Sequence, residues 1–334
     1  MRRVLVLAGI AALFLGVCLP AAAADNPFVG HWALTIPSGG AGWLGVTQED
    51  GYLDARILWG GGSVVPTASA WVEGDTLYVL RLKKVERKKN GKVVLTQQWP
   101  TLITAQRSGE NLYLKEFVPN TNGKGTRESD FTGKWTPAPG PKPDLSKVKY
   151  GAPIELFNGK NLDGWRLTNE NQRNGWSAVD GVLDNNPVQP EGEHYRYGNL
   201  RTDAEFKDFN LKLEVEVPEN GNSGIYLRGI YEIQVSDSYG KPLDAHNMGG
   251  LYSRIKPAVN AEKPAGQWQS MDITLVDRHI TVILNGKTII DNEPALGCTG
   301  GALWSDPFKA GPIYLQGDHR AVKFRNMVLT PVVE

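Results

Sequence analysis

Polar side chains suited to chemistry gather in the segment 222–240. Strand alternation, with a tight turn near Gly229-Ile230, gives this segment one apolar and one polar face. The apolar face would carry Ile225, Leu227, Ile233 and Val235, and the polar face Tyr226, Arg228, Glu232, Gln234 and Ser236. Such a row on adjacent strands can line a groove. Alternatively, it is a solvated outer face on which an Arg228–Glu232 pair contributes little.

Other catalytic signatures are absent from the sequence. It contains no Gly-x-Ser-x-Gly motif, phosphate-binding loop, dinucleotide fingerprint or Cys-x-x-Cys pair. The five histidines are scattered singly, so no two of them share one element as metal ligands. Cys298 lies among small residues, where a lone cysteine is more often inert than nucleophilic. We therefore predict neither a metal nor a cofactor.

The elements that must position the polar row are strands. Gly 38 and Pro 21 in 334 residues indicate a turn-rich β protein. In the first half, runs of alternating polarity occur at 31–36, 43–48, 52–58, 69–72, 76–82, 93–99 and 112–116. The second half continues with enough runs for two stacked sheets, among them 209–217, 224–228, 231–236, 249–255, 267–276 and 311–316. We predict an all-β fold in which a smaller antiparallel barrel or meander precedes a β-sandwich.

Alternating prolines between positions 137 and 143 favour an extended spacer. They divide the chain into a small β-barrel-like domain (25–135), a Pro-rich linker (136–150) and a second domain (151–334). Before them, Arg2 and Arg3 precede an apolar run and four alanines, as in a secretory signal peptide ending at residue 24. We expect export to the periplasm or beyond. Lipidation at Cys18 is the less favoured alternative.

Charge bears on possible partners. Lys+Arg and Asp+Glu both number 36, so the chain has no bulk charge for nucleic acid, and no apolar run comfortably spans a membrane. Basic residues nevertheless crowd the predicted hairpin at Asn90-Gly91, namely Lys83, Lys84, Arg87, Lys88, Lys89 and Lys92. They could contact an anionic polymer. A solvated turn whose like charges deter aggregation is favoured, because Glu86 interrupts the run and no aromatic residue is interleaved.

Four ordered motifs resemble a known family. They begin at Leu156-Phe157-Asn158-Gly159, at Asn222-Ser223-Gly224, at Tyr231-Glu232-Ile233 and at Gly311-Pro312-Ile313, the last followed by 322–326. Over about residues 152–332 the chain resembles the 3-keto-disaccharide hydrolase family. The resemblance implies a concanavalin A-like jelly roll, related in fold to glycoside hydrolase family 16, in secreted bacterial proteins. It also implies a carbohydrate substrate, an oxidised glucoside or disaccharide. The first domain lies outside the resemblance and is assigned no activity.

The chemistry implied by this resemblance uses the polar row. A ketone at sugar carbon 3 acidifies the hydrogen on carbon 2, so a carboxylate can remove it while the group on carbon 1 leaves and water then adds. The implied base is Glu232, Arg228 is the cation facing the enolate, and Asp237 assists the leaving group. The implied substrate-binding residues are Tyr226, Gln234, Tyr239, His246, Gln316 and His319. The spacing from Gln316 to His319 departs from the family's pattern.

Two alternatives stay open at this level. The residues Glu232, Gln234 and Asp237 resemble the catalytic strand of glycoside hydrolase family 16, but Gln replaces the middle acid and Asp237 has the wrong strand parity. A non-catalytic carbohydrate-binding module is the third possibility, because fold does not decide function. Elimination and direct hydrolysis are equally open for the enzyme.

Overall fold

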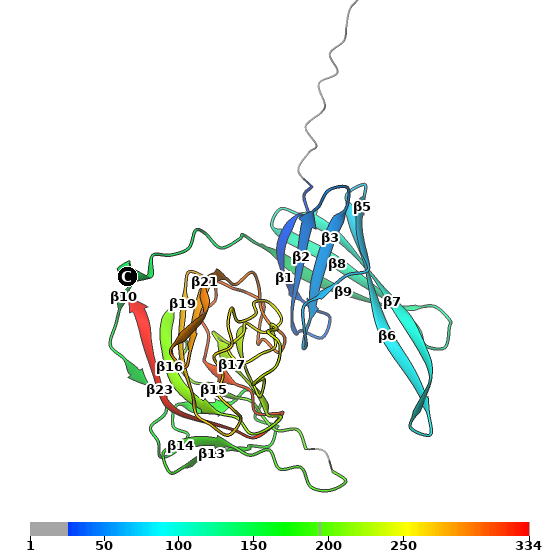
Figure 1. The fold of residues 1–334 in the computed structure, drawn as a ribbon. Coiled ribbons are helices and arrows are strands. Elements are labelled where there is room, and N and C mark those ends of the chain that lie inside the picture. The colour runs from blue at the N-terminus through cyan, green and yellow to red at the C-terminus, as the bar shows by residue number, and fades with distance from the viewer. Residues whose placement is uncertain (1–25, 194, 334) are drawn as a thin grey trace, which may run out of the picture.

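The computed structural model describes residues 26–193 and 195–333. The predicted signal peptide lies outside these ranges and stays a prediction. Nearly all regular structure is antiparallel β, and the sheets form a nine-stranded N-terminal layer and a two-sheet sandwich (Figure 1). The all-β expectation is confirmed. Within the described ranges, no helix has the length and apolar character that a bilayer crossing requires.

The N-terminal sheet has the strand order β4-β3-β2-β1-β9-β8-β7-β6-β5. Its strands are β1 (Gly30–Thr35), β2 (Ala41–Gln48), β3 (Leu53–Trp59), β4 (Val65–Pro66), β5 (Ser69–Glu73), β6 (Thr76–Lys89), β7 (Lys92–Ser108), β8 (Asn111–Pro119) and β9 (Thr126–Thr136). Strand β1 pairs with β9, which brings Trp32 edge-to-face with Trp135 at 5.3 Å. Alternate residues such as Leu34, Val79 and Ile103 turn inward and form a separate apolar core.

Strands β6 and β7 extend beyond the rest of this sheet as a two-stranded arm, residues 82–99 (Figure 1). A two-residue turn joins Lys89 to Lys92, and both Asn90 (φ 51°) and Gly91 (φ 75°) have the positive φ that such turns require. The predicted hairpin is confirmed. Its strands are far longer than the sequence pattern indicated, because the arm has no apolar face whose alternation would reveal it.

The second half of the chain forms a jelly-roll sandwich. One sheet has the order β13-β14-β23-β16-β19-β20-β21, with β10 and β11 also on β23, and the other has the order β12-β15-β22-β17-β18. The strands of the first sheet are β10 (Lys149–Tyr150), β11 (Ile154–Glu155), β13 (Trp176–Val179), β14 (Val182–Asn185), β16 (Phe209–Glu216), β19 (Gln269–Val276), β20 (His279–Leu284), β21 (Lys287–Pro294) and β23 (Val322–Val333). Those of the second are β12 (Trp165–Leu167), β15 (Leu200–Thr202), β17 (Asn222–Leu227), β18 (Tyr231–Ser236) and β22 (Tyr314–Leu315). Apolar residues from the two sheets meet in one core.

The expected strand at 249–255 is wrong. In its place, turns follow one another and only Leu251 bridges to Ile233 of β18 and to Ile255. The backbone of this segment still covers the edge of β18, since Tyr252 N–H donates to Glu232 O and Gly249 N–H donates to Gln234 O. An irregular segment therefore protects the sheet edge that carries the polar row.

The connection between the two halves lies against the sandwich. It contains the 3₁₀ turn η1 (Leu145–Lys147). The Arg278 guanidinium donates to the Pro137 and Ala138 carbonyl oxygens at 2.8 and 3.0 Å, and Asn292 Nδ2 donates to Pro143 O at 2.8 Å. The segment predicted as an extended spacer thus contacts the sandwich at both ends of its proline run.

Direct contacts also join the N-terminal sheet to the sandwich. The Trp43 indole N–H donates to Leu296 O at 3.1 Å, and the Arg254 guanidinium stacks 4.4 Å from the Trp43 ring. Ser63 Oγ lies 2.8 Å from His246 Nε2. Trp43 belongs to the apolar cluster of the sandwich, so the two halves share part of one core.

Candidate active site

The polar face of the five-stranded sheet carries two lateral rows of side chains. Registers align Arg201 with Tyr314, Tyr314 with Tyr226, and Tyr226 with Glu232, which makes the first row. The second row contains Gln316, whose N–H donates to Gly224 O, and Gln234, which pairs with Gly224. As alternation predicts, Ile225, Leu227, Ile233 and Val235 point to the opposite face and into the core.

Glu232 lies on this polar face and is only 3% exposed. Its Oε2 is 2.8 Å from the Tyr226 hydroxyl oxygen. Its Oε1 lies against Gly224, where any Cβ would overlap it. Among the described residues Oε1 has no hydrogen-bond partner, so this oxygen is the one available to a substrate.

Two tyrosines support Glu232. The Tyr226 and Tyr314 rings stack with centroids 4.0 Å apart and 9° between their planes. The Tyr226 hydroxyl oxygen is 2.6 Å from Gly300 O, and the Tyr314 hydroxyl donates to Gly301 O at 3.3 Å while accepting from Asn199 Nδ2 at 3.1 Å. The 300–301 carbonyls therefore fix both phenols beside the carboxyl group.

This arrangement favours a protonated carboxyl group. Tyr226 has one proton, and a carbonyl can only accept, so donation to Gly300 O leaves the tyrosine oxygen as an acceptor for a protonated Glu232. The pKa of Glu232 is raised from 4.5 to about 8, chiefly by burial. A hydrogen bond donated by Tyr226 to the ionised carboxylate would lower this pKa, and the nearby Asp318 charge raises it. Burial also raises the pKa of both tyrosines, which keeps them neutral. A carboxyl group tuned in this way is typical of proton transfer.

The second row leaves two acceptors free. The Oε1 atoms of Gln234 and Gln316 are buried and have no hydrogen-bond partner among the described residues. Between them lies Gly224, whose missing side chain leaves the space that the Glu232 carboxyl group occupies. An unpaired buried acceptor costs about 1–3 kcal/mol. Donors on a ligand, such as sugar hydroxyls, would satisfy both amides.

Arg228 does not lie beside Glu232, and the predicted pairing is wrong. The residue follows the end of β17 and has a φ of 55°, so strand alternation no longer sets the direction of its side chain. The guanidinium is buried, donates to the carbonyl oxygens of Pro307 and Lys309, and lies 4.0 Å from Asp208 Oδ1. It supports the 307–309 loop.

Other predicted residues are spread around the sheet. Asp237 accepts from the Asn220 N–H at 2.9 Å, and Tyr239 is 55% exposed, so neither joins the Glu232 cluster. His246 lies at the contact with Ser63. His319 is half-exposed beside Asp318 at 2.7 Å, and this hydrogen bond raises the pKa of His319. Of the predicted set, Tyr226, Glu232, Gln234 and Gln316 share one face, and Asp318 connects His319 electrostatically to Glu232.

Several contributors were missed by sequence reasoning. Tyr314 was hidden inside an otherwise apolar motif, although its position two residues before Gln316 is a signal for the same face. Gly224, Asn199 and the 300–301 carbonyls act through backbone position or close approach, for which residue type offers no signal. Within residues 26–193 and 195–333, no three His, Cys, Asp or Glu side chains gather as metal ligands.

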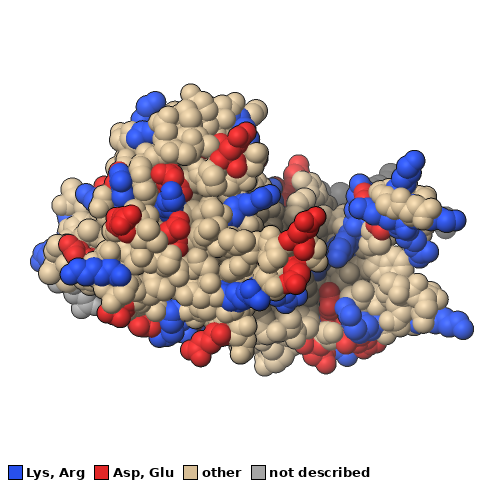
Figure 2. Space-filling view, turned by 90° about the horizontal axis from the view of Figure 1, so that it is seen from below, with Lys and Arg blue, Asp and Glu red and all other residues tan. Residues whose placement is uncertain are grey.

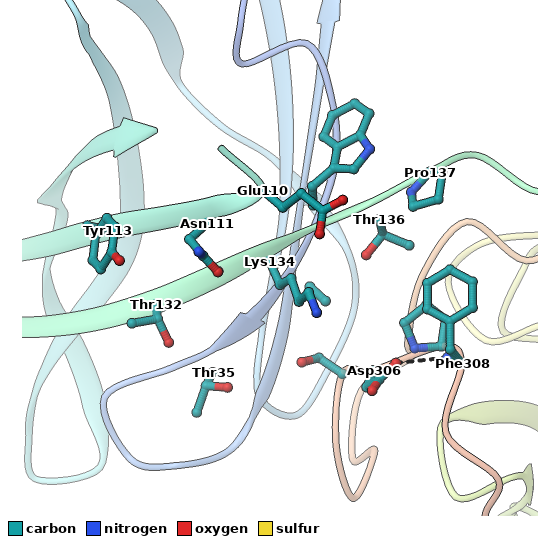
Figure 3. A pocket seen from close by; sticks show the side chains of 15 residues that line it. Thr35, Glu110, Asn111, Tyr113, Thr132, Lys134, Thr136, Pro137, Asp306 and Phe308 are labelled. Atoms are coloured by element: carbon teal, nitrogen blue, oxygen red, sulfur yellow. Dashed lines mark hydrogen bonds between the residues drawn. The ribbon is translucent and has the colours of Figure 1, made fainter. Parts of the chain in front are cut away.

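A groove of about 740 Å³ lies away from Glu232, between β8, β9 and the 305–308 loop. Figure 3 shows Asn111, Thr132 and Lys134 on one side of it and Asp306 and Phe308 on the other. Arg228 holds the second wall through Pro307 O and Lys309 O. The residue predicted for catalysis therefore shapes a groove at the junction of the two halves.

The fold and the buried polar face define a jelly roll with a candidate catalytic carboxyl group on one sheet. Residues 152–330 match the family model described as a 3-keto-alpha-glucoside-1,2-lyase-like domain, which is more than half of the chain. The chain belongs to this family.

Among individual relatives, a 3-keto-disaccharide hydrolase from Bacteroides thetaiotaomicron is 26% identical over 167 residues, covering 41% of this chain and 57% of that protein. The chain therefore matches little more than half the length of that relative. Two solved structures from Parabacteroides distasonis, assigned as glycosyl hydrolases, are 31% and 21% identical. They cover 57% and 54% of this chain and 92% and 94% of theirs, with TM-scores of 0.44 and 0.43.

Proposed function

We propose that this protein is an exported enzyme that cleaves 3-keto-glycosides by removing the proton on carbon 2. The observation that carries the proposal is Glu232, a buried carboxyl group with a pKa near 8 on the same sheet face as the unpaired Oε1 atoms of Gln234 and Gln316. Family membership supports the class of chemistry. Export rests on the sequence of residues 1–24.

The proposed reaction begins with ionised Glu232. Its Oε1 takes the carbon 2 proton, and the electron pair moves into a carbon 2–carbon 3 double bond with the negative charge on the ketone oxygen. This enolate then re-forms the ketone, the carbon 1–carbon 2 double bond forms, and the bond from carbon 1 to the leaving oxygen breaks. The protonated Glu232 then returns its proton to the leaving oxygen. Water adds across the double bond and completes a net hydrolysis. A base with a pKa near 8 suits a carbon acid better than an ordinary carboxylate, because its conjugate acid is weaker.

The enolate oxygen needs a donor other than Arg228, which points elsewhere. We assign this role to the Tyr314 hydroxyl, which belongs to the same row as Glu232 and which burial keeps protonated. In this assignment its proton turns from Gly301 O, 3.3 Å away, to the enolate oxygen. Gln234 and Gln316 accept from sugar hydroxyls. The sequence-based hypothesis assigned the chemistry to Glu232, Arg228 and Asp237. The proposal from the structure keeps Glu232 and adds the Tyr314 hydroxyl and the side-chain amides of Gln234 and Gln316.

A retaining mechanism of the family 16 type is less well supported. It needs two carboxyl groups about 5–5.5 Å apart. Gln234 occupies the position two residues after Glu232, and Asp237 is engaged with the Asn220 backbone. A pure binding module would have no use for a carboxyl group whose charge burial suppresses.

The test is turnover of a matched pair of substrates. The mature protein is incubated with an aryl glucoside and with its 3-keto counterpart, and release of the aryl group is followed. We expect turnover of the keto form alone. Comparable turnover of the unoxidised glucoside would support family 16 chemistry, and binding of either compound without turnover would support the binding module.

A further inference from the structure

A second groove, which we call the arm groove, lies at the base of the β6–β7 arm and measures about 670 Å³. Its lining includes Trp59, Arg81, Lys83, Trp99, Thr101 and Arg127. In Figure 2, blue side chains gather at the right-hand end of the molecule, where Figure 1 places the arm. The arm groove belongs to the half of the chain that the family model does not cover.

The arm groove exists because the inner face of the N-terminal sheet changes character along its strands. Val79 and Ile103 are buried in the apolar core. Two residues further from that core, on the same face, the paired positions are Arg81 and Thr101. The inward-facing positions of these strands are therefore apolar near the core and polar near the strand ends. Ligand sites are common at such polar openings of β-barrels.

Lys84 lines the arm groove and pairs with Glu86 at 2.9 Å, but the other three cations of the groove have no ion-pair partner among the described residues. The Arg81 guanidinium lies 4.6 Å from the centre of the Trp59 ring, and among the described residues it makes no hydrogen bond and no ion pair within 4.0 Å. The same holds for Lys83 and Arg127 in that part of the chain. Glu116 is the one acidic residue in the lining, and it is only 8% exposed. The groove therefore presents net positive charge with free donors.

Aromatic side chains supply rigid walls. The Trp99 indole N–H donates to Pro119 O at 3.2 Å, and the Trp59 ring packs edge-to-face on Phe131 at 5.2 Å. Sequence reasoning discounted an anionic ligand at this hairpin because Glu86 interrupts the basic run. It also objected that no aromatic residue is interleaved. The fold removes that objection, since Trp59 comes from β3 and Trp99 lies opposite Lys83.

The arm groove also adjoins the sandwich. Gly61 and Ser63 line it, and Ser63 Oγ lies 2.8 Å from His246 Nε2. Gly62 packs so closely on Gly300 that a Cβ at position 300 would overlap the Gly62 backbone. Gly300 O is the acceptor that holds Tyr226. A ligand in the arm groove therefore lies next to a loop that contacts the wall of the candidate active site.

We propose that the arm groove binds an acidic saccharide, a sugar segment that carries carboxylate or sulfate groups. Trp59 and Trp99 contact sugar faces, and Arg81, Lys83 and Arg127 bind the anionic groups by charge-assisted hydrogen bonds. That the ligand is a saccharide rests on the proposed function. The preference for negative charge rests on the arm groove alone.

Isothermal titration of the mature protein tests the proposal with three probes: trigalacturonate for carboxylate, a dextran sulfate oligosaccharide for sulfate, and maltotriose as the neutral control. We expect at least one acidic probe to bind at least about tenfold more tightly than maltotriose, and less tightly in 300 mM than in 50 mM salt. Which acidic probe binds identifies the anionic group. Binding of neither, or equal binding of maltotriose, overturns the proposal.

Paired variants separate the arm groove from general charge. Lys83→Gln with Arg127→Gln should weaken binding of the acidic probe about tenfold or more. Lys88→Gln with Lys89→Gln, at the exposed arm tip, removes the same charge and should change it less than about twofold. Equal losses in the two pairs would show non-specific attraction. Binding of a DNA duplex or phosphatidylglycerol vesicles with the same dependence on Lys83 and Arg127 would favour a different polyanion and also overturn the proposal.

Turnover distinguishes the two proposals. Both variant pairs should cleave a small neutral 3-keto glucoside at the unaltered rate, because neither pair touches the Glu232 cluster. If the unaltered protein lacks that turnover, the proposed function fails, whereas the titrations still decide whether the arm groove selects acidic ligands.

Discussion

The Glu232 face and the arm groove treat charge in opposite ways. Glu232 is buried beside a phenol and its pKa rises to about 8, so the protein holds the proton where water would release it. Arg81, Lys83 and Arg127 line the arm groove and have no hydrogen-bond or ion-pair partner in the described part of the chain. A carboxyl group that burial keeps neutral and that ionises during a reaction suits proton transfer. Cationic side chains with free hydrogen-bond donors suit the binding of an anionic ligand. The difference predicts catalysis at the Glu232 face and selective binding of an anionic ligand in the arm groove.

The largest effect should come from Glu232→Gln. The change keeps shape and one acceptor oxygen but removes the proton acceptor, and we expect kcat/KM for a 3-keto glucoside to fall roughly 10²–10⁴-fold. Glu262→Gln is the matched control, because burial also raises the pKa of Glu262, whose carboxylate binds only Ser238. It should stay within about threefold of the unaltered enzyme. Equal losses in both variants would remove Glu232 from the mechanism.

Gly224→Ala should follow in size. A methyl group at this position overlaps Glu232 Oε1, and the flexible carboxyl end, rather than the backbone, must move away. A displacement near 1 Å at a reacting group can cost about 10²-fold in rate. Gly140→Ala is the control, since nothing lies within 4 Å of a Cβ there. Circular dichroism should show both proteins folded, and a fully active Gly224→Ala enzyme would contradict this placement of Oε1.

The pH dependence should sharpen the contrast between the two regions. If Glu232 acts as the base, kcat/KM for a neutral 3-keto glucoside rises about tenfold per pH unit below its pKa and levels off above about 8. Lys83→Gln with Arg127→Gln should leave this profile unmoved. A profile that is flat from pH 5 to 9 would show that an ordinary carboxylate or another group limits the rate.

How much of this could be read from the sequence depends on what positions each residue. Alternation correctly separated Tyr226, Glu232 and Gln234 from Ile225, Ile233 and Val235, because two paired strands have a fixed period of two. The same rule failed one residue later. Arg228 already belongs to the turn, and its positive φ sends the side chain to the 307–309 loop. Alternation predicts which face of the sheet a side chain lies on only for residues that are paired in the strands.

Long-range contacts account for the rest. Gly300 O reaches Tyr226 across 74 residues, and Trp59 reaches Arg81 from another strand. No local pattern encodes either contact. At the basic hairpin, neighbours in sequence gave no sign of aromatic side chains, because the aromatic side chains near it are brought there by the tertiary structure. The motif resemblance succeeded where periodicity could not, since it covered about residues 152–332 together, and the family model confirmed it over residues 152–330.

The smallest predicted effect concerns stability. Between pH 4.5 and about 8 the folded protein keeps the Glu232 proton, whereas the unfolded chain has released it. Because the folded state then binds more protons, the free energy of unfolding falls as pH rises through this window and stays lower above it. Glu232→Gln has no such proton to lose. Its Tm should therefore exceed that of the unaltered protein at pH 9, by roughly 2–4 °C for each kcal/mol recovered, and the advantage should shrink toward pH 4. Scanning calorimetry at several pH values measures this, with Lys83→Gln as the comparison because its charge is solvated. A gain in Tm that is equal at every pH would reflect packing alone and would mean that the folded protein does not hold the Glu232 proton.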